Sequence, residues 1–265
     1  SDTAAHSGSD TAAHSGSDTA AHSGSDAAAH SGSDTGDPSL DLERAEVPAP
    51  VRRYLDAVFE GTPRPASRVR LEQRGEIRLG GRWYPFDATQ HVRTSPPGFL
   101  WDARVHLPSI AFVRVHDSFV DGDGRIEARF LSAVPVAREG PSPDVNAGEL
   151  ARFLAEAPWY PGSLLPHRGL VWEPIDARTS RATVEANGVR SSLVFHFDDE
   201  GLIERVTGLR FRQETGSIED WVGDFGDYVS YDGRLVPTSV CVAWAHPSGE
   251  QPYFRASIEG IDYTI

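Results

Sequence analysis

Short turn sequences recur along the chain from Val69 onward and constrain its fold more than any other feature. Six of them, each containing glycine, lie at residues 80–81, 121–124, 187–188, 199–201, 232–233 and 247–249. Each separates stretches that are rich in Val, Ile, Phe, Tyr, Trp and Thr. Asp-Gly and Asn-Gly adopt the positive φ angles of tight hairpin turns, so the pattern is typical of antiparallel strands. The turn signals therefore predict a mainly β (α+β) fold of about ten strands.

The strands themselves are predicted from composition and from alternation of apolar and polar residues. We place them at residues 68–79, 82–93, 98–107, 110–120, 125–137, 169–176, 179–186, 189–197, 202–213, 234–246 and 251–264. Alternation is clear in 98–107, where Phe99 and Trp101 share one face and Arg104 and His106 share the other. We therefore expect one packed face and one wetter face. Residues 214–231 have mixed periodicity and are predicted as a loop-rich stretch with room for a short strand near 225–231.

Two segments have the periodicity of helices. Residues 48–59 carry apolar side chains at i, i+3, i+4 and i+7, and residues 147–157 carry an apolar stripe that ends at Pro158. The second helix interrupts the run of hairpin signals. We expect a strongly curved antiparallel sheet or half-barrel, with the N-terminal helix and this internal helix packed on its concave face.

The first 36 residues form an octapeptide array that reads SDTAAHSG in its first three units. Such an array has no apolar face to bury, so residues 1–36 are predicted to be a disordered tail and residues 37–265 a single β-rich domain. Histidines at positions 6, 14, 22 and 30 could hold a divalent ion weakly, but nothing preorganises them. We predict neither a metal site nor a cofactor.

Charge and cysteine content narrow the classes of partner. The formal net charge is −14, which argues against nucleic acid or an anionic membrane as a partner. All 25 basic residues are arginine, and the lone Cys241 rules out an intramolecular disulfide. No apolar run reaches the ~18 residues that span a bilayer. The chain as given begins without a signal peptide, so we expect a cytoplasmic protein, and its oligomeric state stays open.

Residues 149–166 (ELARFLAEAPWYPGSLLP) are the best candidate for a binding site. The helix ends on a proline-braced bend that carries two large aromatic residues, and further tryptophans lie on predicted strands. These residues could line an apolar pocket with a polar mouth. The predicted wall residues are Trp101, Trp159, Tyr160, Trp172 and Trp244, and the predicted mouth residues are Arg104, Arg152 and Glu156. The alternative is that the helix plugs the sheet and these aromatics are core.

A second hypothesis is a hydrolase or isomerase that uses His106 or His116 with Asp117 as an acid–base pair in the same cavity. The competing interpretation is that these residues form the solvated face of a sheet. GxSxG, GxGxxG, HExxH and Walker motifs are all missing from the sequence. The phrase VDGDGRIEARF does not fit the spacing of an EF-hand and is typical of a hairpin turn.

Several phrases carry a resemblance to a known family. They include VPAPVRRYLDAVFEG, LEQRGEIRL, WYPFDATQ, PPGFLWDARV, VRVHDSFVDGDG, GELARFLAEAPWYPGSLLP, VWEPID, FDDEGLI and YDGRLVPTSVCVAW. Over about residues 46–264 the chain resembles an uncharacterised family of bacterial and archaeal domain-of-unknown-function proteins. The resemblance indicates kinship and implies no particular activity.

The final third is also similar, more loosely, to periplasmic lipoprotein-carrier proteins, through the hairpin at Tyr231–Trp244. That resemblance implies a half-open barrel with a lipid-sized cavity. Together with the aromatic segment it favours non-enzymatic binding of an apolar or amphipathic, lipid-like small molecule. A protein-interaction scaffold is a third hypothesis, and the ligand's identity stays open.

Overall fold

The computed structural model describes residues 47–265, apart from residues 168 and 213–214. The predicted tail at 1–36 and the start of the predicted domain at 37–46 lie outside the described residues. The helices in the described part are α2 (Ala49–Val58), α3 (Pro143–Ala155) and the short 3₁₀ helices η1 (Ala157–Trp159) and η2 (Pro161–Leu164).

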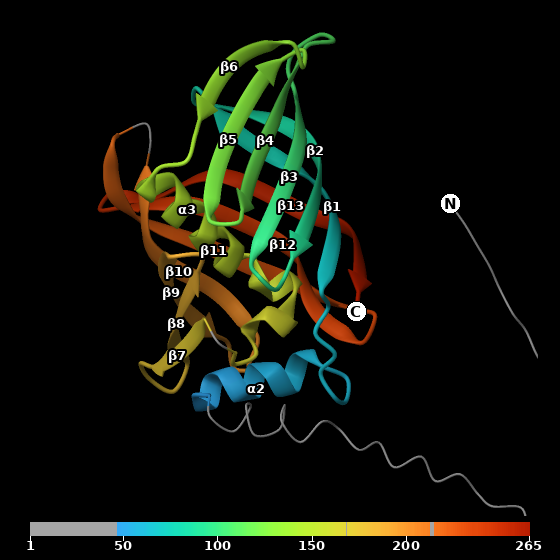
Figure 1. The fold of residues 1–265 in the computed structure, drawn as a ribbon, viewed down its shortest axis with the longest axis vertical. Coiled ribbons are helices and arrows are strands. Elements are labelled where there is room, and N and C mark those ends of the chain that lie inside the picture. The colour runs from blue at the N-terminus through green and yellow to red at the C-terminus, as the bar shows by residue number, and fades with distance from the viewer. Residues whose placement is uncertain (1–46, 168, 213–214) are drawn as a thin grey trace, which may run out of the picture. The chain divides into compact units, whose positions relative to one another are not determined.

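All strands belong to one antiparallel sheet, so the fold is mainly β, as predicted (Figure 1). The first group is β1 (Arg68–Leu79), β2 (Arg82–Arg93), β3 (Gly98–His106), β4 (Phe112–Val120), β5 (Asp123–Phe130) and β6 (Val134–Glu139). The second group is β7 (Leu170–Pro174), β8 (Thr179–Ala186), β9 (Val189–Phe197), β10 (Ile203–Arg212), β11 (Ser217–Tyr231), β12 (Arg234–His246) and β13 (Gly249–Thr264). Neighbours in sequence are neighbours in the sheet, and β1 pairs with β13 to join the two groups.

The sheet is open and is not strongly curled, so it does not form the half-barrel expected from the sequence. Its edges are β6 and β7, which do not pair with each other within the described residues. Both edge strands are short and carry a proline, Pro135 in β6 and Pro174 in β7. Proline lacks a backbone N–H, and short proline-containing strands are typical of edges that do not extend.

Two parts of the strand prediction were wrong, and the sheet has 13 strands instead of about ten. The predicted strand 125–137 is divided into β5 and β6 by a turn in which Leu131 and Ser132 have positive φ angles. Residues of these types rarely adopt positive φ angles, so no turn was predicted there. The predicted loop-rich stretch 214–231 contains β11, a strand of 15 residues.

Both predicted helices are present and amphipathic. The buried face of α2 includes Tyr54, whose ring lies 5.9 Å from that of Phe197 on β9. Helix α3 begins earlier than the predicted residue 147 because Ser142 caps it: the Ser142 Oγ accepts a hydrogen bond from the Val145 N–H at 3.2 Å. It ends at Ala155, three residues before Pro158.

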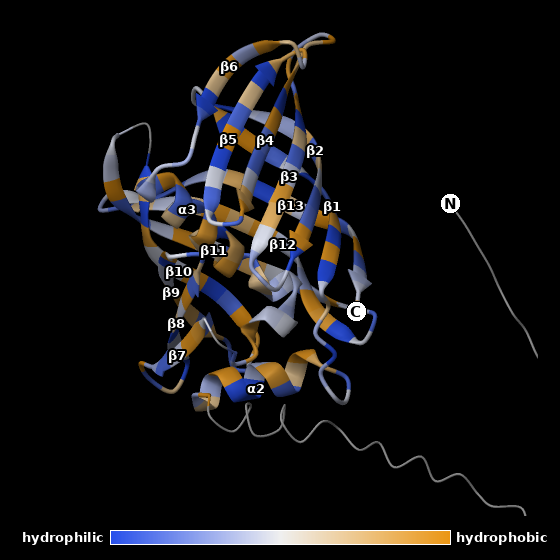
Figure 2. Cartoon of the chain, in the orientation of Figure 1, coloured by the Kyte–Doolittle hydropathy of each residue, from blue (hydrophilic) through white to orange (hydrophobic). Residues whose placement is uncertain are grey.

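Helix α3 lies across the sheet between strands of the two groups (Figure 1). It contacts β3, β4 and β5 of the first group and β8, β9 and β10 of the second. Its apolar residues Leu150, Phe153 and Leu154 are buried against these strands. Apolar and polar residues alternate along many of the strands (Figure 2), which gives the sheet a packed face toward α3 and a wetter outer face.

The seam between β1 and β13 depends on the absence of a side chain at Gly75, which pairs with Ala256. A Cβ atom at Gly75 would lie 2.1 Å from the Arg255 carbonyl oxygen and 2.8 Å from the Ala256 Cα. We expect Gly75→Ala to lower the free energy of unfolding by about 1–3 kcal/mol, since backbone atoms must move apart. Chemical denaturation measures this, with Gly140→Ala as control because its Cβ would meet nothing within 4 Å. Equal effects in the two variants would contradict the close approach.

Candidate functional site: a pocket beside helix α3

A pocket of about 1080 Å³ lies between α3 and the packed face of the sheet. Residues from both groups of strands line it. Its apolar wall includes Ile77, Val113, Val115, Ile126, Ala128, Val240, Val242 and Phe254. Its aromatic residues with polar atoms are Trp101, Trp159, Trp221, Trp244 and Tyr253, and its charged residues include Asp117, Glu149, Arg152, Glu156, Arg210 and Arg212. The arrangement is mainly apolar with a small group of charges, which is typical of small-molecule sites.

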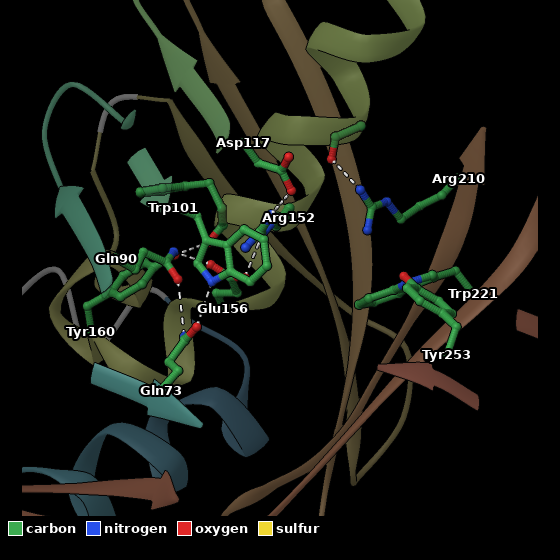
Figure 3. A network of polar contacts seen from close by, with 12 residues as sticks. Gln73, Gln90, Trp101, Asp117, Arg152, Glu156, Tyr160, Arg210, Trp221 and Tyr253 are labelled. Atoms are coloured by element: carbon green, nitrogen blue, oxygen red, sulfur yellow. Dashed lines mark hydrogen bonds and ion pairs between the residues drawn. The ribbon is translucent and has the colours of Figure 1, made fainter. Parts of the chain in front are cut away.

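Arg152 of α3 is the centre of the charged group (Figure 3). Its Nη1 lies 2.7 Å from Asp117 Oδ2 on β4, and its Nε lies 2.8 Å from Glu156 Oε1 one helical turn later. The side chains of these three residues are largely buried: Arg152 is 15% exposed, Asp117 16% and Glu156 14%. Burial of a guanidinium is tolerated here because two carboxylates and a tryptophan face, that of Trp101 at 4.9 Å, surround it.

A chain of hydrogen bonds fixes the position of Glu156. Its Oε2 accepts a hydrogen bond from Gln90 Nε2 at 2.5 Å, and Gln90 Oε1 accepts one from Gln73 Nε2 at 3.2 Å. The Trp101 indole N–H donates to Gln73 Oε1 at 2.7 Å. These residues come from the adjacent strands β1, β2 and β3 (Figure 3). Each side chain in this hydrogen-bonded series has a partner, so the pocket wall beside Glu156 is rigid.

The opposite wall is built around Arg210 of β10. Its guanidinium lies over the Trp221 ring at 5.2 Å and its Nη2 donates to the Gly148 carbonyl oxygen of α3 at 2.9 Å. The Trp221 indole N–H donates to the Tyr253 hydroxyl at 2.9 Å, which joins β11 to β13. These contacts hold α3 to the second group of strands (Figure 3).

Two carboxyl groups in the pocket are incompletely partnered. Glu149 Oε2 and Asp117 Oδ1 are buried and have no hydrogen-bond partner among the described residues. Burial, followed by the charge of Asp117, raises the pKa of Glu149 to about 8, although Arg152 and Arg210 act in the opposite direction. Burial likewise raises the pKa of Asp117 above its ordinary value, against the effect of Arg152. Glu149 is therefore expected to hold a proton near neutral pH.

Three of the predicted wall residues lie in the pocket and two lie elsewhere. Trp101, Trp159 and Trp244 line it. Tyr160 is buried in the core, where its hydroxyl donates to the Phe153 carbonyl oxygen at 2.6 Å. Trp172 packs on a core phenylalanine and donates to the Leu164 carbonyl oxygen at 3.0 Å. For these last two residues the structure agrees with the alternative of core aromatics.

The three residues predicted to form a polar mouth do not lie together at the entrance of the pocket. Arg152 and Glu156 line the interior of the pocket, because Asp117 and Gln90 supply the partners that let them be buried. Arg104 does not line the pocket. It is exposed on the outer face of β3, with its guanidinium 4.5 Å from the centre of the Phe112 ring.

The predicted acid–base pair is not assembled. His116 and Asp117 are consecutive in β4, so their side chains point to opposite faces of the sheet. His116 lies 3.5 Å from Asp102 on the outer face, where Arg114 also pairs with Asp102. His106 is on that outer face as well, with its Nε2 2.8 Å from Asp87 Oδ2. The hypothesis that these histidines share a cavity with Asp117 is therefore wrong.

The pocket residues that were not predicted as site residues from the sequence include Glu149, Arg210, Trp221 and Tyr253. The signal for Trp221 was present, because Trp221, Gly223 and Phe225 alternate along β11 and all line the pocket. The two glycines of this segment hid that alternation. Glu149 also had a signal in the sequence, because it lies beside the apolar stripe of α3. A carboxyl group buried at such a position is uncommon and indicates a functional role.

Two general features of the described residues bear on function. No group of three or more His, Cys, Asp and Glu side chains in the described part of the chain is arranged to hold a metal ion. None of the helices described at 47–265 is both long enough and apolar enough to cross a membrane.

Residues 45–263 match the model of a family of unknown function, DUF6920. The match spans most of the chain, so the protein belongs to the DUF6920 family. This agrees with the resemblance to a domain-of-unknown-function family that the sequence phrases indicated. No curated protein matches the chain.

Solved structures to which this chain is similar include a protein of the LolA superfamily. A protein of that superfamily from Nitrosomonas europaea is 11% identical, with a TM-score of 0.36 over 82% of this chain and 92% of that one. A domain described as an outer membrane lipoprotein-sorting protein, from Vibrio parahaemolyticus, is 8% identical, with a TM-score of 0.41 over 85% and 91%. A DUF1329 family protein from Desulfovibrio piger is 11% identical, with a TM-score of 0.43 over 85% and 93%.

Proposed function

We propose that this protein binds an amphipathic, lipid-like small molecule, without chemical conversion, in the pocket beside α3. The observation that carries the proposal is the pocket itself: about 1080 Å³ of space with apolar walls and one buried group of charges. The volume is slightly above the ~300–1000 Å³ that is typical of small-molecule sites. In this proposal the ligand is enclosed between α3 and the strands of both sheet groups that contact it.

The walls and the charged group have different roles in binding. Apolar wall area provides roughly 25 cal/mol for each Å² of ligand surface removed from water, offset by the cost of association. Arg152 is already held by Asp117 and Glu156, so a ligand meets charges whose positions are fixed before binding. Such preorganisation favours a ligand with one polar end.

The exposure of the lining residues indicates where the pocket opens to solvent. Leu79, which precedes the β1–β2 turn, and Val136 of β6 both line the pocket and are exposed. By contrast, Glu149, Trp101 and Trp159 also line the pocket and are buried. We therefore propose that the apolar end of the ligand lies toward Leu79 and Val136 and its polar end toward α3.

Filling the pocket tests the proposal. Val115 is half-buried in the apolar wall of β4, and Val115→Trp is expected to weaken binding of an apolar fluorescent probe, N-phenyl-1-naphthylamine, by at least about tenfold. Native mass spectrometry of the purified protein should also lose any co-purified lipid-like mass. The matched control is Val171→Trp, because Val171 is 59% exposed on β7 and does not line the pocket. Unchanged probe binding in a folded Val115→Trp protein would refute the proposal.

A further inference from the structure

Glu149 and the four charged groups that interact electrostatically with it comprise three carboxyl and two guanidinium groups. Asp117, Glu149 and Glu156 face Arg152 and Arg210. Arg212, at the rim of the group, is already paired with Glu219 at 3.0 Å on β11. With all five groups ionised, this cluster around Glu149 has an excess of one negative charge. A low-dielectric site does not hold such an excess without a cation or a proton.

The unpartnered oxygens show where a cation would bind. Glu149 is 5% exposed, lines the pocket, and its Oε2 has no partner among the described residues. The same holds for Asp117 Oδ1, whose other oxygen is bound to Arg152. The two carboxyl groups interact electrostatically, since Asp117 is the main charge that raises the pKa of Glu149. A donor group placed between them would satisfy two buried acceptors, each of which otherwise costs free energy.

An apolar stripe leads away from this position along neighbouring strands. Asp117 pairs with Ile126, and the next inward positions of the two strands are Val115 with Ala128 and then Val113. All of these side chains line the pocket. Four residues of β-strand from Asp117 to Val113 span about 13 Å. The stripe therefore offers an extended apolar surface that starts at the unpartnered oxygens.

We infer that the ligand is an amphipathic amine, whose ammonium group donates hydrogen bonds to Asp117 Oδ1 and Glu149 Oε2 while its apolar body lies along the Val113–Val115 stripe. This inference rests on the proposed function and specifies its ligand class. Arg210, whose Nε has no described partner, is the group that would attract an anionic head instead. The ionised carboxyl groups of Asp117 and Glu149, which interact electrostatically with Arg210, oppose an anion, so the electrostatics favour the amine.

Binding of an amine has a protonation signature. Without ligand, Glu149 has a pKa of about 8 and holds a proton at neutral pH. The groups that face it are Asp117 from β4, Arg152 and Glu156 from α3, Arg210 from β10 and Tyr253 from β13. An ammonium beside Glu149 favours its ionised form, so the proton leaves as the amine binds. Near pH 7 we expect release of up to one proton for each amine bound, whereas an anionic ligand would release none.

Isothermal titration calorimetry with three ligands of equal chain length tests the inference on the full chain. The ligands are decylamine, decanol and decanoate, each below its micelle-forming concentration, in two buffers of different ionisation enthalpy. We expect decylamine to bind at least about tenfold more tightly than the other two and to release protons. Glu149→Gln should remove the proton release and weaken decylamine about tenfold, with decanol unchanged. The control Glu173→Gln removes an exposed carboxylate on β7 and should change nothing.

The outcomes distinguish failure of the amine inference from failure of the proposed binding function. If decanol or decanoate binds as tightly as decylamine and Val115→Trp abolishes that binding, the amine inference is overturned and the binding function stands. If all three ligands fail to bind the folded protein, the proposed function fails as well. Asp117→Asn provides a second variant for the amine, with its fold checked by circular dichroism because it also loses an ion pair with Arg152.

Discussion

Replacement of Arg152 by methionine is expected to lower the free energy of unfolding by about 3–5 kcal/mol, because it leaves buried carboxylates without their cation. Arg152 binds Asp117 at 2.7 Å and Glu156 at 2.8 Å. Methionine preserves most of the aliphatic packing, so the decrease in the free energy of unfolding reports the contribution of the ion pairs. Urea denaturation at neutral pH, followed by tryptophan fluorescence, gives the free energy. The effect should shrink at acidic pH as Asp117, whose pKa is raised by burial, becomes protonated.

The matched control is Arg114→Met on the outer face. Arg114 makes a bidentate ion pair with Asp102, but the two side chains are 42 and 41% exposed. Exposed pairs of this kind contribute roughly 0–1 kcal/mol. A loss at Arg152 no greater than that at Arg114 would contradict the burial of the network.

Stability of the native protein is expected to fall as pH rises from about 5 to about 8, with a slope that approaches 1.4 kcal/mol per pH unit. Burial raises the pKa of Glu149 from its ordinary 4.5 to about 8. Between these values the folded protein keeps a proton that the unfolded chain releases, so each rise in pH favours unfolding. Asp117, whose pKa is also raised, contributes in the same direction at the acidic end.

Glu149→Gln tests this assignment because glutamine has the same shape and does not titrate. The variant should show a flatter pH dependence and should be more stable than the native protein at pH 8. Denaturation curves at several pH values between 5 and 9 measure both. Glu173→Gln, which changes an exposed carboxylate, should follow the native curve. A slope that Glu149→Gln leaves intact would show that another group is responsible.

Turn chemistry and alternation predicted much of the sheet. The bounds predicted for 68–79, 82–93, 179–186, 189–197 and 234–246 coincide with β1, β2, β8, β9 and β12. Errors arose where local signals were weak. Leu131 and Ser132 form a turn without glycine, and the glycines of β11 are accommodated inside a strand. In both places tertiary packing, and not local propensity, decides the conformation.

The candidate site was harder to predict because it depends on which faces and strands meet. Period-two alternation placed Trp101 on the packed face, but the same rule separates His116 from Asp117, which had been combined in one hypothesis. The pairing of Arg152 with Asp117 joins residues 35 positions apart and follows from the approach of α3 to β4. Sequence spacing alone cannot supply such a contact.

The seam between β1 and β13 has a consequence for how the protein is made. Among the described strands, β13 leaves the ribosome last, yet it forms the bridge between the two strand groups. Until it emerges, β1 and β12 each present an unsatisfied backbone edge to solvent or to chaperones. A nascent chain therefore accumulates two half-sheets that unite in a late step, and premature termination before residue 249 leaves both halves prone to aggregation.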